Sequence, residues 1–244
     1  MGRVCIINQS MPEIGYVART TTPGEEFEMV SRFLDHLILH YSGLKRKNAL
    51  VFLEPQIETG YPDIVIAEYF TSPSHKNETR DRLNNDDLRI LFHIQQRKNV
   101  KLSQLSNDLG FSAKDAVRSV KRLSKAGLVN LSKKKSHVRN VPLQSYCTIT
   151  RLISIEAKLD KWSDAVRQAE YNTWFSSDSF IMLNKEKCNA SIREKCQKEG
   201  IGIILLNGNV KTELKCTTHE FPSSYASLQF NEWVYRFLNL SIRE

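Results

Sequence analysis

The chain has 244 residues, enough for one large domain or two small ones with a substantial hydrophobic core. The composition, 41% hydrophobic and 25% charged with 10 Gly and 7 Pro, excludes collagen-like and low-complexity classes. No apolar run approaches the roughly 18 residues of a membrane span, and no signal-peptide pattern is visible. Because the five cysteines also form no Cys-x-x-Cys pair, we expect a cytoplasmic protein without membrane contact, disulfide framework or structural zinc.

The first part of the chain is predicted to form a helix, two strands and a linker. Residues 24–41 carry apolar side chains at helical spacing, with Phe27 on the inner face, and acidic residues in the first turn, where the helix dipole favours anions. Strands are predicted over residues 48–58 and 63–70. Residues 71–85 are polar and are predicted to be the linker.

A separate module is predicted between residues 84 and 147. Ser112, with Asp115 three residues later, indicates a capped third helix, and Gly127 tolerates the left-handed conformation that follows a helix end. The predicted elements, in order, are helices over residues 86–96, 102–109 and 112–126 and strands over residues 128–131 and 138–143.

The first pattern resumes after this module. The predicted elements are strands over residues 148–158, 179–183 and 202–206 and helices over 160–175, 190–198 and 230–240, with Asp160 or Ser163 as the cap of the first helix. This order describes an α/β fold with a mixed sheet and helices, interrupted by a small inserted domain. The predicted boundaries are residues 1–79 and 148–244 for the α/β domain and residues 80–147 for the insert.

The positive charge is concentrated in the insert. Residues 84–147 contain 13 Lys and Arg against 4 Asp and Glu, whereas the rest of the chain has 22 against 23. The overall formal charge of +8 therefore comes from one segment. Such a field attracts a polyanion, which favours nucleic acid as the partner over a merely solvated basic face.

Three helices, a glycine turn and a basic hairpin resemble a winged helix-turn-helix. The resemblance implies that the third helix enters the DNA major groove and that the hairpin reaches phosphate. Lysines suit contacts to phosphate more than base reading. The alternative is a winged helix used for protein contacts. The candidate DNA-binding residues are Lys114, Arg118, Lys121, Arg122 and Lys125 of the third helix and Lys133, Lys134, Lys135 and Arg139 of the hairpin.

Three residues of the α/β part offer the kinds of side chain that phosphodiester hydrolysis needs. This reaction needs a divalent cation held by carboxylates, an aligned water and stabilisation of the leaving oxygen. Asp63 follows a proline at a strand start, and Glu156 and Lys158 end an otherwise apolar strand. Alternation along that strand predicts that Glu156 and Lys158 share one face. An acid and a base in such a strand are costly unless they are paired or liganded.

Pro62-Asp63 followed by Glu156-Ala157-Lys158 resembles the PD-(D/E)xK nuclease superfamily, with the restriction-endonuclease-like fold. The resemblance covers residues 24–75 and 148–210. It implies Mg²⁺, with Mn²⁺ as an alternative, bound by Asp63 and Glu156, and a catalytic Lys158. The 93 positions between Asp63 and Glu156 exceed the usual spacing of the family, and the insert accounts for the difference.

The same resemblance implies further site residues. The spacing Gly24-x-x-x-Glu28 makes Glu28 the candidate metal ligand from the first helix, with Glu26 as the alternative. Gln168, and more weakly Tyr171, match a helix whose Gln faces the active site in the family. Glu54 and Glu58 are expected to be exposed strand residues, with a role as additional metal ligands as the alternative.

Together these patterns predict a Mg²⁺-dependent DNA endonuclease whose winged helix docks duplex DNA. Nucleases of this superfamily often act as dimers, so a homodimer is compatible with the prediction. The alternative is a catalytically inactive, nuclease-like regulator or adaptor that binds DNA. Metal-dependent cleavage distinguishes the two.

Overall fold

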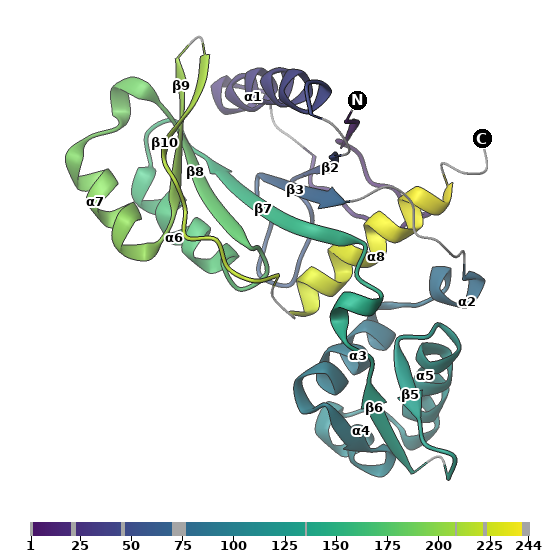
Figure 1. The fold of residues 1–244 in the computed structure, drawn as a ribbon. Coiled ribbons are helices and arrows are strands. Elements are labelled where there is room, and N and C mark those ends of the chain that lie inside the picture. Colours follow the sequence, from purple (N-terminus) through teal and green to yellow (C-terminus); the bar gives the residue numbers. More distant parts are fainter. Residues whose placement is uncertain are drawn as a thin grey trace. The chain divides into compact units, whose positions relative to one another are not determined.

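The computed structural model describes residues 2–20, 23–44, 47–69, 77–134, 136–207, 209–221 and 224–240 (Figure 1). The chain divides into two compact units. The first, here called the sheet unit, comprises Met1–Thr71 and Ile149–Pro222. The second, here called the helical unit, comprises Ser72–Thr148 and Ser223–Glu244.

A mixed seven-stranded sheet forms the centre of the sheet unit, in the order β1-β2-β3-β7-β8-β9-β10. Neighbouring strands are antiparallel at β2–β3, β3–β7 and β9–β10 and parallel at β1–β2, β7–β8 and β8–β9. β2 and β3 are buried along their whole length, as expected for apolar strands covered on both faces. The strands are β1 (Val4–Ile7), β2 (Asn48–Leu53), β3 (Ile64–Tyr69), β7 (Ile149–Ala157), β8 (Asp178–Asn184), β9 (Gly202–Asn207) and β10 (Asn209–Leu214).

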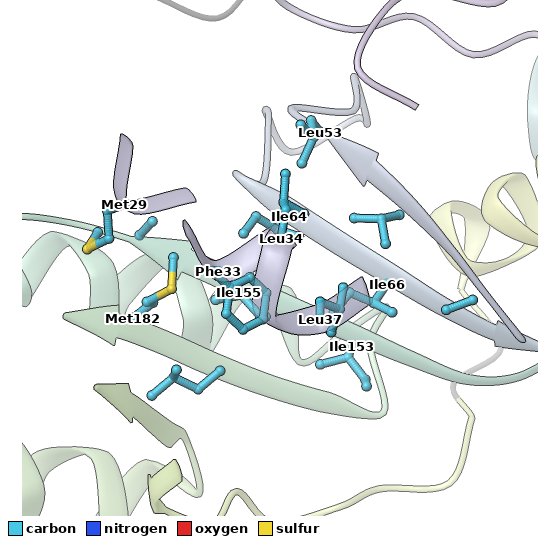
Figure 2. Packing of buried hydrophobic residues seen from close by; sticks show 14 of the residues in the cluster. Met29, Phe33, Leu34, Leu37, Leu53, Ile64, Ile66, Ile153, Ile155 and Met182 are labelled. Atoms are coloured by element: carbon cyan, nitrogen blue, oxygen red, sulfur yellow. The ribbon is translucent and has the colours of Figure 1, made fainter. Parts of the chain in front are cut away.

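Helices flank the sheet on both faces. Helix α1 (Glu25–Ser42) packs Met29, Phe33 and Leu37 against alternate residues of the strands, including Ile155 (Figure 2). The intervening residues of β8 and β9 contact α6 (Trp162–Asn172) and α7 (Ala190–Glu199). Because side chains alternate along a strand, the two clusters lie on opposite faces, which confirms the predicted α/β class.

The helical unit combines helices with a three-stranded antiparallel sheet of order β4-β6-β5. Its core includes Ile94, Leu105 and Val120. As predicted, the Ser112 side chain accepts a hydrogen bond from the Asp115 amide, and Gly127 has a positive φ of 77°. The elements are α2 (Glu78–Asp81), α3 (Asn85–Arg97), β4 (Asn99–Lys101), α4 (Leu102–Leu109), α5 (Ala113–Lys125), β5 (Val129–Leu131), β6 (His137–Asn140) and α8 (Tyr225–Leu240), with short 3₁₀ turns at Leu143–Ser145 here and at Lys185–Lys187 in the sheet unit.

The last helix differs from the sequence-based boundaries. We expected residues 148–244 to belong to one domain, but α8 belongs to the helical unit. Tyr225 and Leu228 lie in the core of that unit, and Glu232 pairs with the buried Arg80. α8 also begins at Tyr225, five residues earlier than predicted.

Smaller differences have local causes. The short edge strand β1 and the polar strand β10 have too little apolar alternation to be recognised, and β4 has three residues. The first turn of α6 has no side-chain cap, so neither Asp160 nor Ser163 plays that role. Within the predicted linker, residues 78–81 form α2, and residues 71–76 lie outside the described residues. Among the described helices, none has both the length and the apolar composition needed to cross a bilayer.

Candidate active site

Asp63 lies at the junction of two chain segments that are far apart in the sequence. It immediately precedes β3, whose antiparallel pairing with β7 places Ile64 opposite Ile155. The Asp63 carboxylate therefore reaches the end of β7, where its Oδ2 accepts a 2.8 Å hydrogen bond from the Ala157 amide. Sheet pairing across the insert thus brings Asp63 beside Lys158, whose Nζ is 3.1 Å from the same oxygen.

Lys158 is held in place by three oxygen atoms. Besides Asp63, its Nζ donates to the Ala157 carbonyl at 3.0 Å and lies 3.9 Å from Glu26 Oε2. Burial lowers the pKa of Lys158, but the charge and hydrogen bond of Asp63 outweigh burial, so the pKa is above its usual value. The side chain is 18% exposed, so a charged ammonium is available at a site that is largely shielded from water.

Glu156 is the most deeply buried acid of the site, at 2% exposure. Its Oε1 accepts a 2.7 Å hydrogen bond from Asn172 of α6. Its Oε2 is buried without a hydrogen-bond partner in the described part of the chain. Burial, with a further contribution from the negative charge of Asp63, raises the pKa of Glu156 to about 8, against the opposing effect of Asn172.

The structure favours Glu26 over Glu28 as the acid from the first helix. Glu28 is 68% exposed and faces Arg32 at 3.9 Å, whereas Glu26 lies beside Lys158 and lines the same cavity. The expected ligand set of Glu28, Asp63 and Glu156 is therefore not assembled. Among the described residues, no group of three or more His, Cys, Asp or Glu side chains is arranged to hold a metal ion.

The two carboxylates that do converge still fit a magnesium ion. Mg²⁺ retains several waters and is commonly bound by one or two carboxylates together with substrate phosphate oxygens. The buried Oε2 of Glu156 has no hydrogen-bond partner among the described residues and lies near Asp63. A bound cation would supply the missing partner. Asp63 and Glu156 are consequently the residues that would hold the ion.

A cavity of about 210 Å³ opens above this site. Glu26, Asp63 and Lys158 line it together with Glu54 and Arg19, which form an ion pair with each other. Glu54 was expected to be an exposed strand residue, but it follows the end of β2 with a positive φ of 46°. A positive φ is rare for residues other than glycine, and the exceptions cluster at functional sites.

Helix α6 contacts the site through Asn172, whereas Gln168 was the predicted residue. Gln168 is half-buried, and its Oε1 is buried without a hydrogen-bond partner among the described residues. It lies one turn before Asn172 on α6, so both residues occupy one face of that helix. Asn172 contacts Glu156 directly and was missed, because an amide on a helix gives no motif of its own. Tyr171 is exposed to solvent.

The candidate DNA-binding residues divide into exposed and internally paired ones. Arg118 is exposed and pairs with Asp115, one turn away, whereas Arg122 forms a 2.7 Å ion pair with the fully buried Asp87. Arg122 therefore joins α3 to α5 and already has a partner within the protein, and its contact with DNA stays a prediction. Lys135 lies outside the described residues. The exposed members of the set are Lys114, Arg118, Lys121, Lys125, Lys133, Lys134 and Arg139.

The raised pKa of Glu156 predicts a pH-dependent stability of the metal-free protein. Between the ordinary pKa of 4.5 and about 8, the folded state keeps a proton that the unfolded state has lost. The resulting stabilisation is complete below pH 4.5 and disappears as the pH rises through 8. Between pH 6 and pH 9 we expect a loss on the order of 2 kcal/mol in the free energy of unfolding, measured by urea titration in EDTA.

The Glu156→Gln variant should not show this part of the pH dependence, because glutamine resembles the protonated acid. Glu170→Gln, at an exposed position of α6, is the matched control and should behave like the wild type. An identical pH dependence in the wild type and in Glu156→Gln would contradict the prediction.

The site as a whole combines a shielded carboxylate pair, a fixed ammonium group and a solvent-connected cavity. This combination suits chemistry on an anionic substrate with a divalent cation. No protein-family model matches the chain, and neither a curated protein nor a solved structure is significantly similar to it.

Proposed function

We propose that this protein is a metal-dependent DNA endonuclease of the PD-(D/E)xK type. The observation that carries the proposal is the convergence of Asp63, Glu156 and Lys158 at the ends of β3 and β7, although the first two are 93 positions apart. The order α1, β2, β3, β7, α6, β8 agrees with the order of elements on which the resemblance was based.

The chain's own residues have distinct tasks in the proposed reaction. Asp63 and Glu156 would hold Mg²⁺, which, when bound, supplies Lewis-acid stabilisation of the charge on the scissile phosphate. Lys158 positions the attacking water and stabilises negative charge from its fixed place beside Asp63. Asn172 fixes the orientation of the Glu156 carboxyl group.

The helical unit supports DNA as the substrate. Its succession of α3, β4, α4, α5, β5 and β6 fits the proposed winged helix-turn-helix. Lys114, Lys121 and Lys125 are exposed on α5, and Lys133, Lys134 and Arg139 are exposed at or beside the hairpin tip. We propose that these residues bind the phosphates of duplex DNA.

Metal binding gives the sharpest test of the carboxylate pair. A saturating concentration of Mg²⁺ should raise the melting temperature of the wild type by several degrees, because the ion binds only the folded state. In Asp63→Asn this shift should vanish. The asparagine oxygen still accepts the hydrogen bond from Ala157, so the fold is expected to remain intact.

The matched control is Asp164→Asn, which removes an exposed acid of α6 that pairs only with the exposed Arg167 among the described ion pairs. It should retain the full shift. Equal Mg²⁺ shifts in the wild type and in Asp63→Asn would remove the carboxylate pair as the metal site.

A second candidate is a DNA-binding regulator that performs no chemistry. The missing third acid favours it, since the described residues contain no group of three potential ligands. Incubation with plasmid, branched and single-stranded DNA in Mg²⁺ or Mn²⁺ separates the candidates. Cleavage of any of these substrates that EDTA suppresses supports the nuclease, and DNA binding without cleavage supports the regulator.

A further inference from the structure

A second, larger cavity adjoins the candidate active site. It has a volume of about 620 Å³ and lies between the end of β1, the segment around residues 18–20 and helix α1. It shares Arg19, Phe27, Val30 and Leu53 with the cavity above Asp63 and Lys158. The two cavities are therefore direct neighbours, and we call the second one the side cavity.

The side cavity has an apolar floor. Leu34 and Leu53, which form part of the floor, also belong to the core cluster between α1 and the sheet (Figure 2). Phe27 was expected to face inward, but it is 42% exposed and lines both cavities. An exposed aromatic ring beside an apolar floor offers contact area to a flat ligand.

Polar side chains line the rest of the side cavity. Asn8, Gln9 and Thr20 contribute amide and hydroxyl groups. The side-chain amides of Asn8 and Gln9 make no hydrogen bond to the described part of the chain, and both residues are exposed. Amide groups both donate and accept hydrogen bonds, as the edges of nucleobases do.

The charge of the lining argues for a neutral ligand. Among the described residues that line the side cavity, Arg19 and Asp35 are the charged ones, and their charges are opposite. Arg19 is already paired with Glu54 and lies 5.4 Å from the centre of the Tyr61 ring. The side cavity is therefore poorly suited to phosphate, whereas the adjoining site with Lys158 is suited to it.

We infer that the side cavity receives one unstacked nucleobase of the strand whose phosphate lies at Asp63 and Lys158. A nucleobase has apolar faces and polar edges, which match the floor and the rim, and the volume lies within the range of about 300–1,000 Å³ for small-molecule sites. The inference rests on the proposed function in so far as nucleic acid is the substrate.

The consequence is a preference for DNA in which a nucleotide is already unpaired. Taking a base out of an intact duplex costs stacking and pairing energy, which a bulged nucleotide has largely lost. In EDTA, where no cleavage occurs, we expect the 244-residue chain to bind a duplex with a single-nucleotide bulge about tenfold more tightly than the matched duplex.

The variant Ser31→Trp tests the side cavity directly. Ser31 lines it from α1, and the indole would fill the space. The affinity ratio between bulged and matched duplex, measured by fluorescence anisotropy, should fall to about one. The matched control is His36→Trp, which adds the same bulk at an exposed position of α1 outside the lining and should keep the tenfold ratio.

A second variant tests the side cavity independently, in case Ser31→Trp does not fold. Asn8→Ala combined with Gln9→Ala changes exposed side chains and should lower the ratio by at least about threefold, with an unchanged melting temperature. A free deoxynucleoside monophosphate is the competing ligand. Its binding can be detected by saturation-transfer NMR. The inference would be overturned if the wild type binds this monophosphate, Ser31→Trp does not, and the wild type shows no preference for the bulged duplex.

The outcomes also separate this inference from the nuclease proposal. A bulge preference that Ser31→Trp removes supports the inference even if no DNA is ever cleaved, in which case only the nuclease proposal fails. Cleavage of DNA together with a ratio that is the same in the wild type and in Ser31→Trp overturns the inference and leaves the nuclease proposal standing.

Discussion

Replacing Lys158 with alanine is expected to lower Mg²⁺-dependent DNA cleavage by about 100- to 1,000-fold without changing the affinity for DNA. Lys158 is the one cation within 4 Å of Asp63 among the described ion pairs, and it is held there by the Ala157 carbonyl as well. The variant removes a positioned positive charge, whereas the basic residues of α5 and the hairpin stay in place.

The fold should tolerate this change. In the metal-free protein Glu156, with a pKa of about 8, is largely protonated at neutral pH. Removal of Lys158 therefore does not leave two adjacent negative charges at Asp63 and Glu156. Single-turnover cleavage of plasmid, with binding measured in parallel in EDTA, separates chemistry from docking.

Lys187→Ala is the matched control for this experiment. Lys187 also pairs with an aspartate, Asp160, at 2.6 Å, but both side chains are exposed and lie outside the site. Lys187→Ala should cut DNA at the wild-type rate. Wild-type cleavage by purified Lys158→Ala would refute the assignment of the active site.

The largest expected effect on stability is that of Arg80→Ala in the helical unit. The Arg80 guanidinium donates hydrogen bonds to both carboxylate oxygens of Glu232 and to the Tyr146 carbonyl, the last at 3.1 Å. It also lies 3.9 Å from the centre of the Tyr235 ring. Glu232 is 1% exposed, so the truncation leaves a buried carboxylate that has lost its ion pair and keeps only the weaker hydrogen bond from Asn231 among those described. We expect the helical unit to lose about 3–5 kcal/mol of stability in urea titrations.

Two comparisons isolate this effect. Arg82→Ala, two residues later at an exposed position, should change the free energy of unfolding by less than about 0.5 kcal/mol. The double variant Arg80→Met, Glu232→Leu should recover much of the loss, because it removes both charges and keeps apolar volume. Equal stability of Arg80→Ala and Arg82→Ala would show that the buried ion pair does not hold α8 in this unit.

The sequence predicted the central triad because its signals are local. An acid and a base that end an apolar strand are visible without knowledge of the fold, and so is an Asp after Pro at a strand start. The pairing of β3 with β7 then follows from two apolar strands that must share a sheet.

The choice between Glu26 and Glu28 could not be made in the same way. Both lie in the first turn of α1, and the face of the helix that packs decides between them. That face includes Met29 and Phe33, three and seven residues after Glu26, while Phe27 is exposed instead of buried. The spacing Gly24-x-x-x-Glu28 selected Glu28 without reference to the face of α1 that packs, so the sequence could not decide between the two acids.

Arg122 and α8 show the limit set by distant partners. Arg122 is indistinguishable from its basic neighbours in the sequence, and its pairing depends on Asp87, 35 residues away. Likewise, an amphipathic helix such as α8 indicates that a partner exists but not which one. Its contact with Arg80 spans 152 positions, a separation at which sequence pattern carries no information about pairing.

The two units are interleaved along the chain and not simply nested. An inserted domain made of residues 72–148 alone could fold on the ribosome before the surrounding domain was complete. Here the helical unit also requires α8, which follows the whole second half of the sheet unit in the sequence. During translation the sheet can therefore form before the helical unit is complete. Until α8 is synthesised, some 75 residues after residue 148, part of the apolar surface of the helical unit stays uncovered.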